Sequence, residues 1–418
     1  MILFSTKRAS LVLVERKTYE EMKGEDLLPE DEGVLKDLGM VVADRDEEKK
    51  EVMGLFDRVN RENSELHITV VLNLDCNFSC TYCYEGDMKG NLYMSRGTAG
   101  DLIRFIKARL GEDTKSLLID FYGGEPLLSI GLMKDISEKL GSIARSNGIS
   151  YRFTVVTNGS LFRRKVAEEL LPLGLESVKI TLDGPPDVHN RSRPFKGGGA
   201  SFDAIIQNIH ETCDMVRISI GGNFTEENHA RFVDLLDYLM QEGLTPDRIY
   251  AVKFDPVMRS PETDTAHPGF QGGCITSNEP WVIEAFSTLR GEILKRGYNT
   301  PKITPIFCVV ENRNAFTVNF DGTIYKCPTF IGKKGFEVGD LKTGVNDYAA
   351  EYNLDLWKNA GCAACEYLPL CFGGCRYISL VRDGNLDAPD CKKAYFDAAL
   401  ETFIKQDIRY RLKGGQEG

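Results

Sequence analysis

Three closely spaced cysteines are the residues of this chain most suited to chemistry. Cys76, Cys80 and Cys83 follow the spacing C-x3-C-x2-C, and Tyr82 directly precedes the last of them. Iron–sulfur clusters are held by closely spaced cysteine thiolates, and a cubane contains four irons. Three local cysteines would leave one iron without a protein ligand, and an open metal position is typical of catalytic sites. A zinc knuckle is the alternative, but zinc sites usually close with four ligands, and no fourth ligand lies nearby.

The elements that must position these cysteines alternate from residue 66 onward. Strands are expected at 66–74, 117–122, 152–157, 177–182, 216–220 and 248–254, with amphipathic helices at 98–110, 132–144, 164–171, 202–212 and 228–241. Strands that alternate with helices in this way predict an α/β fold with a parallel sheet. Sites gather at the strand-end loops of such folds. The cysteines directly follow the first strand.

Glycine-rich and polar runs end the next strands. They are Tyr122 to Pro126, Thr157 to Gly159 and Thr181 to Pro185, and Arg193 lies further on. Glycines let a backbone approach a ligand closely, and an acceptor-rich edge suits an ammonium group. The guanidinium fork of arginine suits a carboxylate. His189, which follows the last run, is expected to be a structural histidine.

Together with the cysteine triad, these runs resemble the radical S-adenosylmethionine (SAM) superfamily, in particular its peptide- and protein-modifying members. The resemblance implies a partial (β/α)6 TIM-like barrel and a SAM-binding [4Fe-4S] cluster held by the triad. The residues that it assigns to SAM binding are Tyr82, Gly123, Gly124, Glu125, Thr181, Arg193 and Asn223. Among them, the Gly-Gly-Glu segment would contact the SAM amino group, Thr181 the ribose and Arg193 the carboxylate.

Seven further cysteines lie in the last third of the chain. They are Cys308, Cys327, Cys362, Cys365, Cys371, Cys375 and Cys391. Spacing alone groups Cys362, Cys365, Cys371 and Cys375 in one site, and C-x2-C with later cysteines also suits zinc. The whole pattern, however, resembles the SPASM domain of radical SAM enzymes.

The SPASM resemblance implies two auxiliary [4Fe-4S] clusters, which makes three clusters with that of the triad. One auxiliary cluster would be bound by Cys362, Cys365, Cys371 and Cys391, and the other by Cys308, Cys327 and Cys375. The fourth ligand of the second cluster stays open. Either Cys274, the only nearby candidate, supplies it, or that iron faces the substrate. Cys213, at the end of a predicted helix, is expected to be an incidental thiol.

The remaining organisation is read from shorter patterns. Residues 1–65 are expected to hold a strand at 10–14, one or two helices within 19–38, a strand at 40–42 and a helix or linker at 44–51. The barrel is assigned to 66–270, the SPASM domain to 271–400 with a helix at 281–295 and a hairpin at 315–326, and a tail to 401–418. The first segment resembles the leader-recognition regions of peptide maturases, which can capture a peptide as an added strand. A structural extension that covers the barrel is the alternative.

The composition excludes several classes of partner. The 418 residues carry a net charge of −11, whereas nucleic-acid binding needs clustered Lys and Arg. No apolar run approaches the ~20 residues of a membrane span. We therefore expect a cytoplasmic protein with no membrane or nucleic-acid partner, in which the twelve cysteines are metal ligands rather than disulfides.

The resemblance also implies a reaction. SAM would be cleaved reductively to methionine and a 5′-deoxyadenosyl radical, which removes a hydrogen atom from an unactivated carbon. The 75 residues before Cys76 favour a maturase that acts on a ribosomally made precursor peptide, forming a thioether or another crosslink, with flavodoxin or ferredoxin as reductant. The alternative is an anaerobic sulfatase-maturating enzyme, which oxidises Cys or Ser to formylglycine and typically begins close to the triad. The open triad argues against a noncatalytic scaffold, and the acidic composition argues against an RNA-modifying enzyme.

Overall fold

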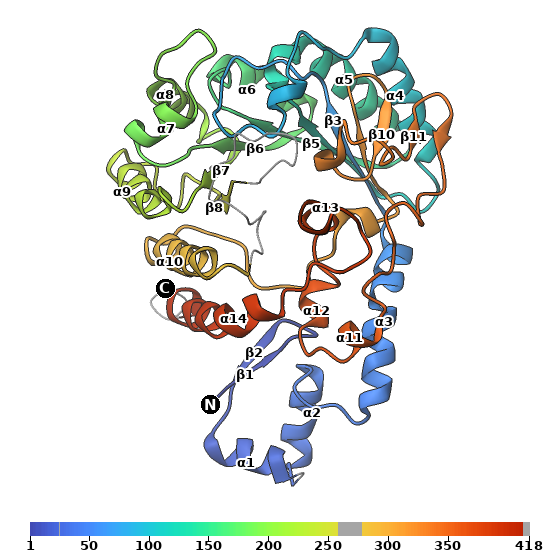
Figure 1. Cartoon of the computed structure of the whole chain (residues 1–418), viewed down its shortest axis with the longest axis vertical. Coiled ribbons are helices and arrows are strands. Elements are labelled where there is room, and N and C mark those ends of the chain that lie inside the picture. The colour runs from blue at the N-terminus through green and yellow to red at the C-terminus, as the bar shows by residue number, and fades with distance from the viewer. Residues whose placement is uncertain (25, 258–277, 413–418) are drawn as a thin grey trace.

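The computed structural model describes residues 1–24, 26–257 and 278–412. A ten-stranded sheet dominates it, with the strand order β12-β11-β10-β9-β3-β4-β5-β6-β7-β8 (Figure 1). Six of these strands run parallel in chain order: β3 (Glu65–Val71), β4 (Ser116–Tyr122), β5 (Ser150–Thr157), β6 (Leu175–Thr181), β7 (Arg217–Phe224) and β8 (Ala251–Pro256). This arrangement confirms the predicted α/β fold with a partial barrel.

Amphipathic helices connect the parallel strands and cover the outer side of the sheet. They are α4 (Arg96–Arg109), α5 (Ile130–Ser146), α6 (Arg164–Leu170), α7 (Pro186–Ser192), α8 (Phe202–Thr212) and α9 (Phe232–Gln241). In α5, Met133, Ile136 and Leu140 recur at helical spacing and are fully buried, as expected for the core-facing stripe of a helix. Strand burial alternates with period two, so Ile68 and Val70 enter the core while His67 lies on the opposite, inner face.

The cysteine-rich region is continuous with this sheet. β9 (Ala315–Val318) pairs in parallel with β3, and β10 (Thr323–Tyr325), β11 (Gly339–Asp340) and β12 (Gly344–Val345) follow in antiparallel order. The hairpin predicted around Asp321 and Gly322 is confirmed, and Gly322 adopts a positive φ of 98° that favours glycine. The sheet therefore contains strands from both of the domains that were predicted to meet near residue 271.

Helices complete the C-terminal region below the sheet in Figure 1. They are α10 (Pro280–Lys295), α11 (Ala360–Ala363), α12 (Leu368–Cys371), α13 (Arg376–Asp383) and α14 (Lys393–Asp407). α10 agrees with the helix expected at 281–295. No helix in the described ranges is long and apolar enough to cross a membrane.

The N-terminal segment forms a small module of strands and helices. It contains β1 (Ile2–Ser5), β2 (Ser10–Leu13), α1 (Arg16–Gly24), α2 (Pro29–Asp37) and α3 (Arg45–Glu62). The strand predicted at 40–42 is wrong. Gly39, at φ 70°, ends α2, and the Met40 and Val41 N–H groups donate back to the Leu35 carbonyl, so these amides close the helix instead of pairing in a sheet.

This module packs on the cysteine-rich region and does not cover the barrel. Val52 and Phe56 of α3 form a buried cluster with Trp357, Leu368 and Phe372. The side chain of Phe4 in β1 packs on a second cluster that joins α12 to α14. In Figure 1 the β1–β2 hairpin accordingly lies beneath α12 and α14, between them and the α1 and α2 helices at the lower end of the molecule.

Candidate active site

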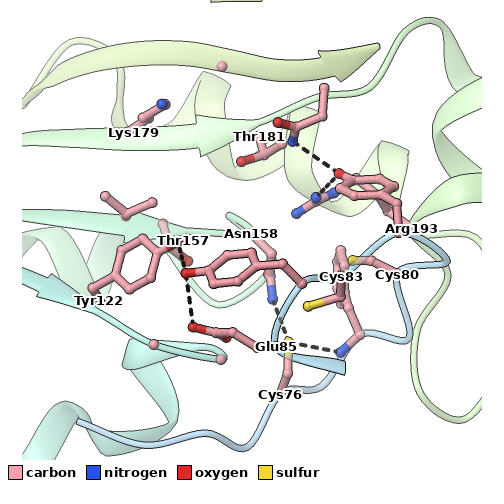
Figure 2. Close-up of a pocket in the computed structure, with 18 of the residues that line it drawn as sticks. Cys76, Cys80, Cys83, Glu85, Tyr122, Thr157, Asn158, Lys179, Thr181 and Arg193 are labelled. Atoms are coloured by element: carbon pink, nitrogen blue, oxygen red, sulfur yellow. Dashed lines mark hydrogen bonds between the residues drawn. The ribbon is translucent and has the colours of Figure 1, made fainter. Parts of the chain in front are cut away.

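A cavity of about 300 Å³ lies at the carboxyl ends of the parallel strands (Figure 2). Parallel sheets place their sites at this edge. The residues predicted from sequence that line it are Cys76, Cys80, Tyr82, Cys83, Gly123, Gly124, Thr181, Arg193 and Asn223. Chain segments that are far apart in sequence therefore meet around a single space.

The loop that carries the triad is held against two neighbouring segments. The Ser79 N–H donates to Pro194 O at 2.9 Å, and the Thr81 N–H donates to Ser192 O at 3.0 Å. On the other side, a Cβ atom at Gly124 would lie 2.1 Å from the Asp75 carbonyl oxygen, much closer than any real contact. The glycine thus lets the end of β4 approach the triad loop.

Glu125 does not line the cavity, unlike the other residues assigned to SAM. Its carboxylate is fully buried and accepts hydrogen bonds from Thr157 Oγ1 at 2.8 Å and from the Asn158 and Leu127 N–H groups at 2.9 and 3.0 Å. Burial raises the pKa of this carboxyl group. Since its oxygens are already engaged, the Glu125 side chain joins the ends of β4 and β5.

Tyr82 is the centre of a buried polar network. Its hydroxyl contacts the Asp183 carboxylate, accepts from Arg193 Nη1 at 2.6 Å and lies 3.1 Å from Asn223 Nδ2. The Asn223 N–H donates to Asp183 Oδ1 at 2.7 Å. Arg193 Nε is buried without a hydrogen-bond partner among the described residues, so one donor of the guanidinium is left for an acceptor such as a ligand carboxylate.

His189 supports this network and does not reach the cavity. Its Nδ1 accepts from the Asp183 N–H at 3.1 Å. Burial, assisted by the charge of Arg193, holds the pKa of His189 far below its usual value, so the ring is neutral. The residue acts as the structural histidine expected from the sequence.

Burial of the triad disfavours thiolates, and nearby cations partly offset this effect. Burial raises the pKa of the Cys76 thiol to about 11 and also raises that of Cys80. Lys89 lines the same cavity; burial would lower its pKa, but the three neighbouring thiolates outweigh burial and raise it. Metal ligation requires thiolates, and Lys89 and Arg193 supply nearby positive charge for them.

The assignment of the triad to an iron–sulfur cluster rests on the cavity that its three cysteines share. Within the described ranges, no three His, Cys, Asp or Glu side chains converge as they do around one ion. In a four-iron cluster, each thiolate binds a separate iron. Three thiols on one short loop, with cations beside them, fit such a cluster.

Three further residues of the cavity were not predicted from the sequence. Tyr84 and Tyr122 join their hydroxyl groups at 2.7 Å, and Tyr84 also donates to Glu85 at 3.3 Å. Burial raises the pKa of Glu85 to about 7. Burial also raises the pKa of Tyr122, and the charges of both Cys83 and Cys327 add to this effect. Tyr122 is therefore within electrostatic reach of both Cys83 and Cys327.

The later cysteines fall into two groups. The pKa of Cys308 is lowered, first by a hydrogen bond with Cys375, while the half-buried Cys327 lies close enough for the charge of Cys308 to affect it. Cys362 lies near Cys391 and Cys365.

Cys371 completes the second group, since the charges of Cys362 and Cys365 both act on its pKa. The structure thus brings Cys375 to Cys308, whereas Cys371 lies near Cys362 and Cys365. The two ligand sets implied by the SPASM resemblance remain a prediction. Cys274 lies outside the described residues. Cys213 is buried at the end of α8, away from both sets.

A polar pair on the inner face of the sheet gives a testable pH dependence. His67 Nε2 lies 2.6 Å from Asp120 Oδ2, and Thr154 Oγ1 donates to Asp120 Oδ1 at 2.5 Å. Burial opposes charge on both groups, but their mutual hydrogen bond and attraction outweigh it, raising the pKa of His67 and lowering that of Asp120. The ion pair should therefore be complete between the ordinary values of 3.8 for Asp and 6.5 for His.

We expect the stability contributed by this pair to fall on both sides of that window. It is lost at low pH as Asp120 is protonated through its lowered pKa, and at high pH as His67 is deprotonated through its raised pKa. Asp120→Asn should lower the free energy of unfolding by about 1.5–3 kcal/mol inside the window and by less outside it. Urea midpoints across pH test this, with His67→Gln expected to remove the alkaline decline and to reduce the acid decline, because His67 is the main cause of the lowered Asp120 pKa. A loss that is equal at every pH would contradict the prediction.

Comparison with known proteins agrees with this geometry. A family model described as the Radical SAM superfamily matches residues 70–239. An uncharacterized protein of Methanocaldococcus jannaschii is 26% identical over 310 residues, which cover 72% of this chain and 96% of that protein. A cysteine-type anaerobic sulfatase-maturating enzyme of Clostridium novyi is 22% identical over 371 residues, which cover 81% of this chain and 96% of the enzyme.

Two solved structures share the fold. Native anSMEcpe with bound AdoMet and Cp18Cys peptide has a TM-score of 0.61 at 18% identity, over 84% of this chain and 98% of its own. Streptococcus suis SuiB bound to precursor peptide SuiA has a TM-score of 0.53 at 14% identity, over 93% of this chain and 95% of its own.

The barrel, the triad and the family match together define a radical SAM domain over residues 70–239. Radical SAM domains are enzyme domains, so the chain is an enzyme. Such a domain implies a [4Fe-4S] cluster and SAM as cofactors, and Cys76, Cys80 and Cys83 are the residues that fit that cluster.

Proposed function

We propose that this enzyme modifies a ribosomally made precursor peptide by forming a thioether or another crosslink. The observation that carries the proposal is the cavity at the carboxyl ends of the barrel strands, which the triad and Tyr122 both line, with the charge of Cys327 also acting on Tyr122. A peptide segment that enters this space would meet SAM on one side, and the Cys308, Cys327 and Cys375 group is proposed to lie beyond Tyr122 on the other. When bound, the reduced triad cluster and SAM supply the radical that removes a hydrogen atom from carbon.

The residues of the chain have separate tasks in this proposal. Arg193 offers an unpartnered donor to the SAM carboxylate, and Gly123 and Gly124 let SAM lie against the end of β4. Thr181 and Asn223 line the same cavity and supply polar contacts to the rest of SAM. Tyr122 bounds the space left for the peptide. Because hydrogen abstraction needs close and oriented reactants, this shaped cavity serves positioning and exclusion of water.

The cysteine-rich region is proposed to be a SPASM domain with two auxiliary [4Fe-4S] clusters. Cys362, Cys365, Cys371 and Cys391 would hold one, and Cys308, Cys327 and Cys375 the other. Among the described residues, no fourth cysteine joins the Cys308, Cys327 and Cys375 group, and the charge of Cys327 acts on the cavity residue Tyr122. A thiolate of the peptide is suited to that position, since iron–sulfur clusters take thiolate ligands. Flavodoxin or ferredoxin is proposed as the electron donor.

The chemistry balances without a further oxidant. In thioether formation, the peptide loses one C–H and one S–H bond and gains one C–S bond. One hydrogen atom ends on 5′-deoxyadenosine and the other leaves as a proton. Cleavage of SAM to methionine and 5′-deoxyadenosine accepts the two electrons that the peptide gives up, so the electron from the reductant is returned after each cycle.

The N-terminal hairpin supports a peptide substrate. β1 and β2 form a separate two-stranded sheet, so each has an open edge among the described residues. Met1 and Val14 exchange backbone hydrogen bonds, and pairs in an antiparallel ladder alternate. The Ile2–Leu13 pair therefore directs its N–H and C=O groups outward, and Leu13 is 64% exposed. Such an apolar edge suits the addition of a peptide strand.

Leu13→Pro is expected to weaken peptide capture while leaving SAM cleavage unchanged. Proline removes the outward N–H of Leu13 but no hydrogen bond within the hairpin. Leu13→Ala keeps that N–H and is the matched control. Fluorescence anisotropy with the labelled peptide substrate measures both variants. Equal binding by wild type and Leu13→Pro would exclude this edge as the docking site.

The proposed function is tested by turnover under anaerobic conditions. Reconstituted enzyme is incubated with SAM, a low-potential reductant and cysteine-containing peptides encoded beside its gene, and the products are analysed by mass spectrometry. Crosslinking predicts a mass decrease equal to two hydrogen atoms together with loss of the free thiol. Unchanged peptide, with 5′-deoxyadenosine formed at the same rate as without peptide, would contradict the proposal.

Formylglycine formation is the second candidate, because a sulfatase-maturating enzyme matches 81% of this chain at 22% identity. The same experiment separates the two activities. A formylglycine product carries an aldehyde that reacts with a hydrazide probe, whereas a crosslinked peptide does not. Hydrazide labelling of a sulfatase-type peptide would favour this second function.

A further inference from the structure

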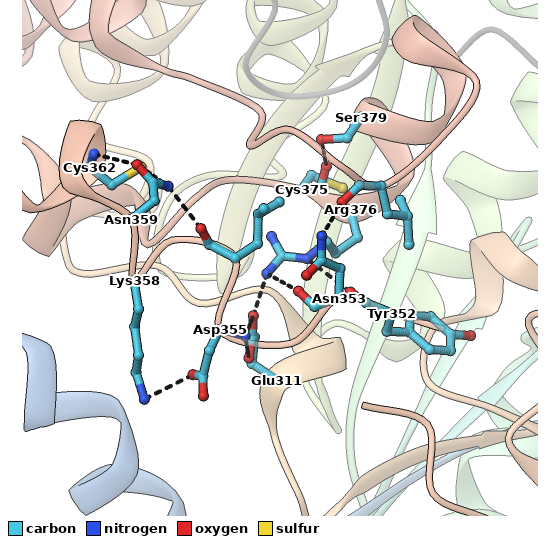
Figure 3. Close-up of polar contacts among 12 residues, drawn as sticks. Glu311, Tyr352, Asn353, Asp355, Lys358, Asn359, Cys362, Cys375, Arg376 and Ser379 are labelled. Carbon is cyan, nitrogen blue, oxygen red and sulfur yellow. Dashed lines mark hydrogen bonds and ion pairs between the residues drawn. The ribbon is translucent and has the colours of Figure 1, made fainter. Parts of the chain in front are cut away.

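An arginine is completely buried in the cysteine-rich region. Arg376 begins α13 directly after Cys375, and its side chain is 0% exposed. Its guanidinium contacts the Glu311 carboxylate through Nη2, and its Nε donates to the Tyr352 carbonyl at 3.3 Å (Figure 3). Glu311 is itself 5% exposed and is fixed by the Asp355 N–H, which lies 3.3 Å from both carboxylate oxygens.

Arg376 is linked to both groups of cysteines. Its backbone N–H donates to Cys308, which is hydrogen-bonded to Cys375, so it belongs to the first group by chain and by contact. Gly373, whose Cβ position lies 3.5 Å from Arg376 Nη1, is in the turn between Cys371 of the other group and Cys375. The positive charge of Arg376 also lowers the pKa of Cys362 in that other group. The guanidinium therefore lies beside residues of both proposed auxiliary sites.

One donor of this guanidinium is unused. Arg376 Nη1 is buried and has no hydrogen-bond partner among the described residues. A Cβ atom at Gly373 would lie 3.5 Å from it, so Nη1 faces the turn between Cys371 and Cys375. A buried charged donor without an acceptor is costly. The sulfur atoms of a cluster held by these cysteines are acceptors of the right charge.

We propose that Arg376 is a positioning residue that sets the reduction potentials of both auxiliary clusters from one place, with Glu311 as its counter-charge. This inference rests on the proposed function, since it requires the two auxiliary clusters. A cluster gains one negative charge on reduction, and its potential depends on net charge and on hydrogen bonds to its sulfurs. The Arg376 cation favours the reduced state of each cluster, and the Glu311 carboxylate opposes it.

Two substitutions with opposite effects test the proposal. Both are made in full-length protein whose Cys76, Cys80 and Cys83 are replaced by alanine, so that only auxiliary clusters remain. Arg376→Gln removes the cation, and both midpoint potentials should shift to more negative values. Glu311→Gln removes the anion and leaves Arg376 in place, so both should shift to more positive values. Redox titration followed by electron paramagnetic resonance measures the potentials.

A matched control separates this effect from lost stability. Arg290 and Asp407 form another largely buried ion pair at 2.7 Å, between α10 and α14. Arg290→Gln should lower thermal stability without moving either potential. If Arg376→Gln prevents folding, Glu311→Gln is compared with the double variant Glu311→Gln/Arg376→Gln, which leaves no unpaired charge. The double variant should then have more negative potentials than Glu311→Gln, because it lacks the Arg376 cation.

The outcomes also distinguish the inference from the proposed function. Opposite shifts of both potentials in the two variants support the inference. Full iron content with unchanged potentials, or a shift of one cluster alone, overturns it and leaves the auxiliary clusters standing. Protein without the triad that binds no iron overturns both the inference and the SPASM part of the proposed function.

Discussion

Cys80→Ala is expected to abolish formation of 5′-deoxyadenosine while most auxiliary iron remains bound. Cys80 lies in the middle of the triad and shares its cavity with Cys76, Cys83 and Arg193. Without Cys80, two irons of the cluster instead of one would have no protein ligand. Among the described residues that line the cavity, no other cysteine could replace Cys80. Iron content should fall by about four per chain. The measurements are iron analysis and chromatography of the reaction with SAM and reductant.

Cys213→Ala is the matched control for this substitution. Cys213 is a buried cysteine at the end of α8 and lies outside both the cavity and the later cysteine groups. Its replacement should leave iron content and 5′-deoxyadenosine formation at the wild-type level. If Cys80→Ala retained SAM cleavage, the triad would not be the site of the reactive cluster.

Cys371→Ala should have a different signature from Cys80→Ala. Cys371 ends α12, beside Cys362 and Cys365 and far along the chain from the triad. Its loss should remove about four irons and bring peptide modification below detection, while a measurable part of SAM cleavage persists. The reason is that hydrogen abstraction depends on the triad, whereas completion of the crosslink depends on the auxiliary sites.

Iron content decides this second prediction. Loss of iron with residual 5′-deoxyadenosine formation agrees with separate clusters in separate regions. An unchanged iron content in Cys371→Ala would refute the auxiliary-cluster assignment, whatever the effect on turnover.

Local patterns in the sequence sufficed for the barrel, and the family resemblance supplied the cavity residues. The alternation of strands and helices predicts the parallel order because each crossover helix buries one apolar stripe against the sheet. Thr181 and Asn223 lie at strand ends, so a correct list of strands places them at one edge of the sheet, whereas Tyr82 and Arg193 lie on the segments that follow β3 and α7. The strand at 40–42 failed because Gly39 and the Leu35 carbonyl use those amides to end a helix.

Features that depend on contacts between distant segments could not be predicted from local sequence patterns. The pairing of β9 with β3 joins residues 315–318 to 67–70, and no nearby sequence feature encodes that register. Cys375 lies four residues after Cys371 in sequence, yet its side chain forms a hydrogen bond with Cys308. Likewise, the Gly-Gly-Glu segment predicts a close backbone approach, but the Glu125 carboxylate turns to Thr157 and Asn158. Its direction follows from buried donors on a neighbouring strand.

Tyr84, Glu85 and Tyr122 could have been singled out by position alone. Tyr84 and Glu85 directly follow the last triad cysteine, and Tyr122 directly precedes the two glycines after β4. Aromatic and acidic residues beside predicted ligands are a usable signal for cavity walls. Their joint hydrogen bonding, however, depends on the fold of the triad loop.

The central claim is that this chain holds three four-iron clusters and cleaves SAM, and anaerobic reconstitution tests it most directly. Iron and sulfide are counted per chain, and 5′-deoxyadenosine is assayed after reduction in the presence of SAM. We predict about twelve irons with an equal amount of sulfide, and 5′-deoxyadenosine as a product. Bound zinc without iron, and no cleavage of SAM, would contradict the account.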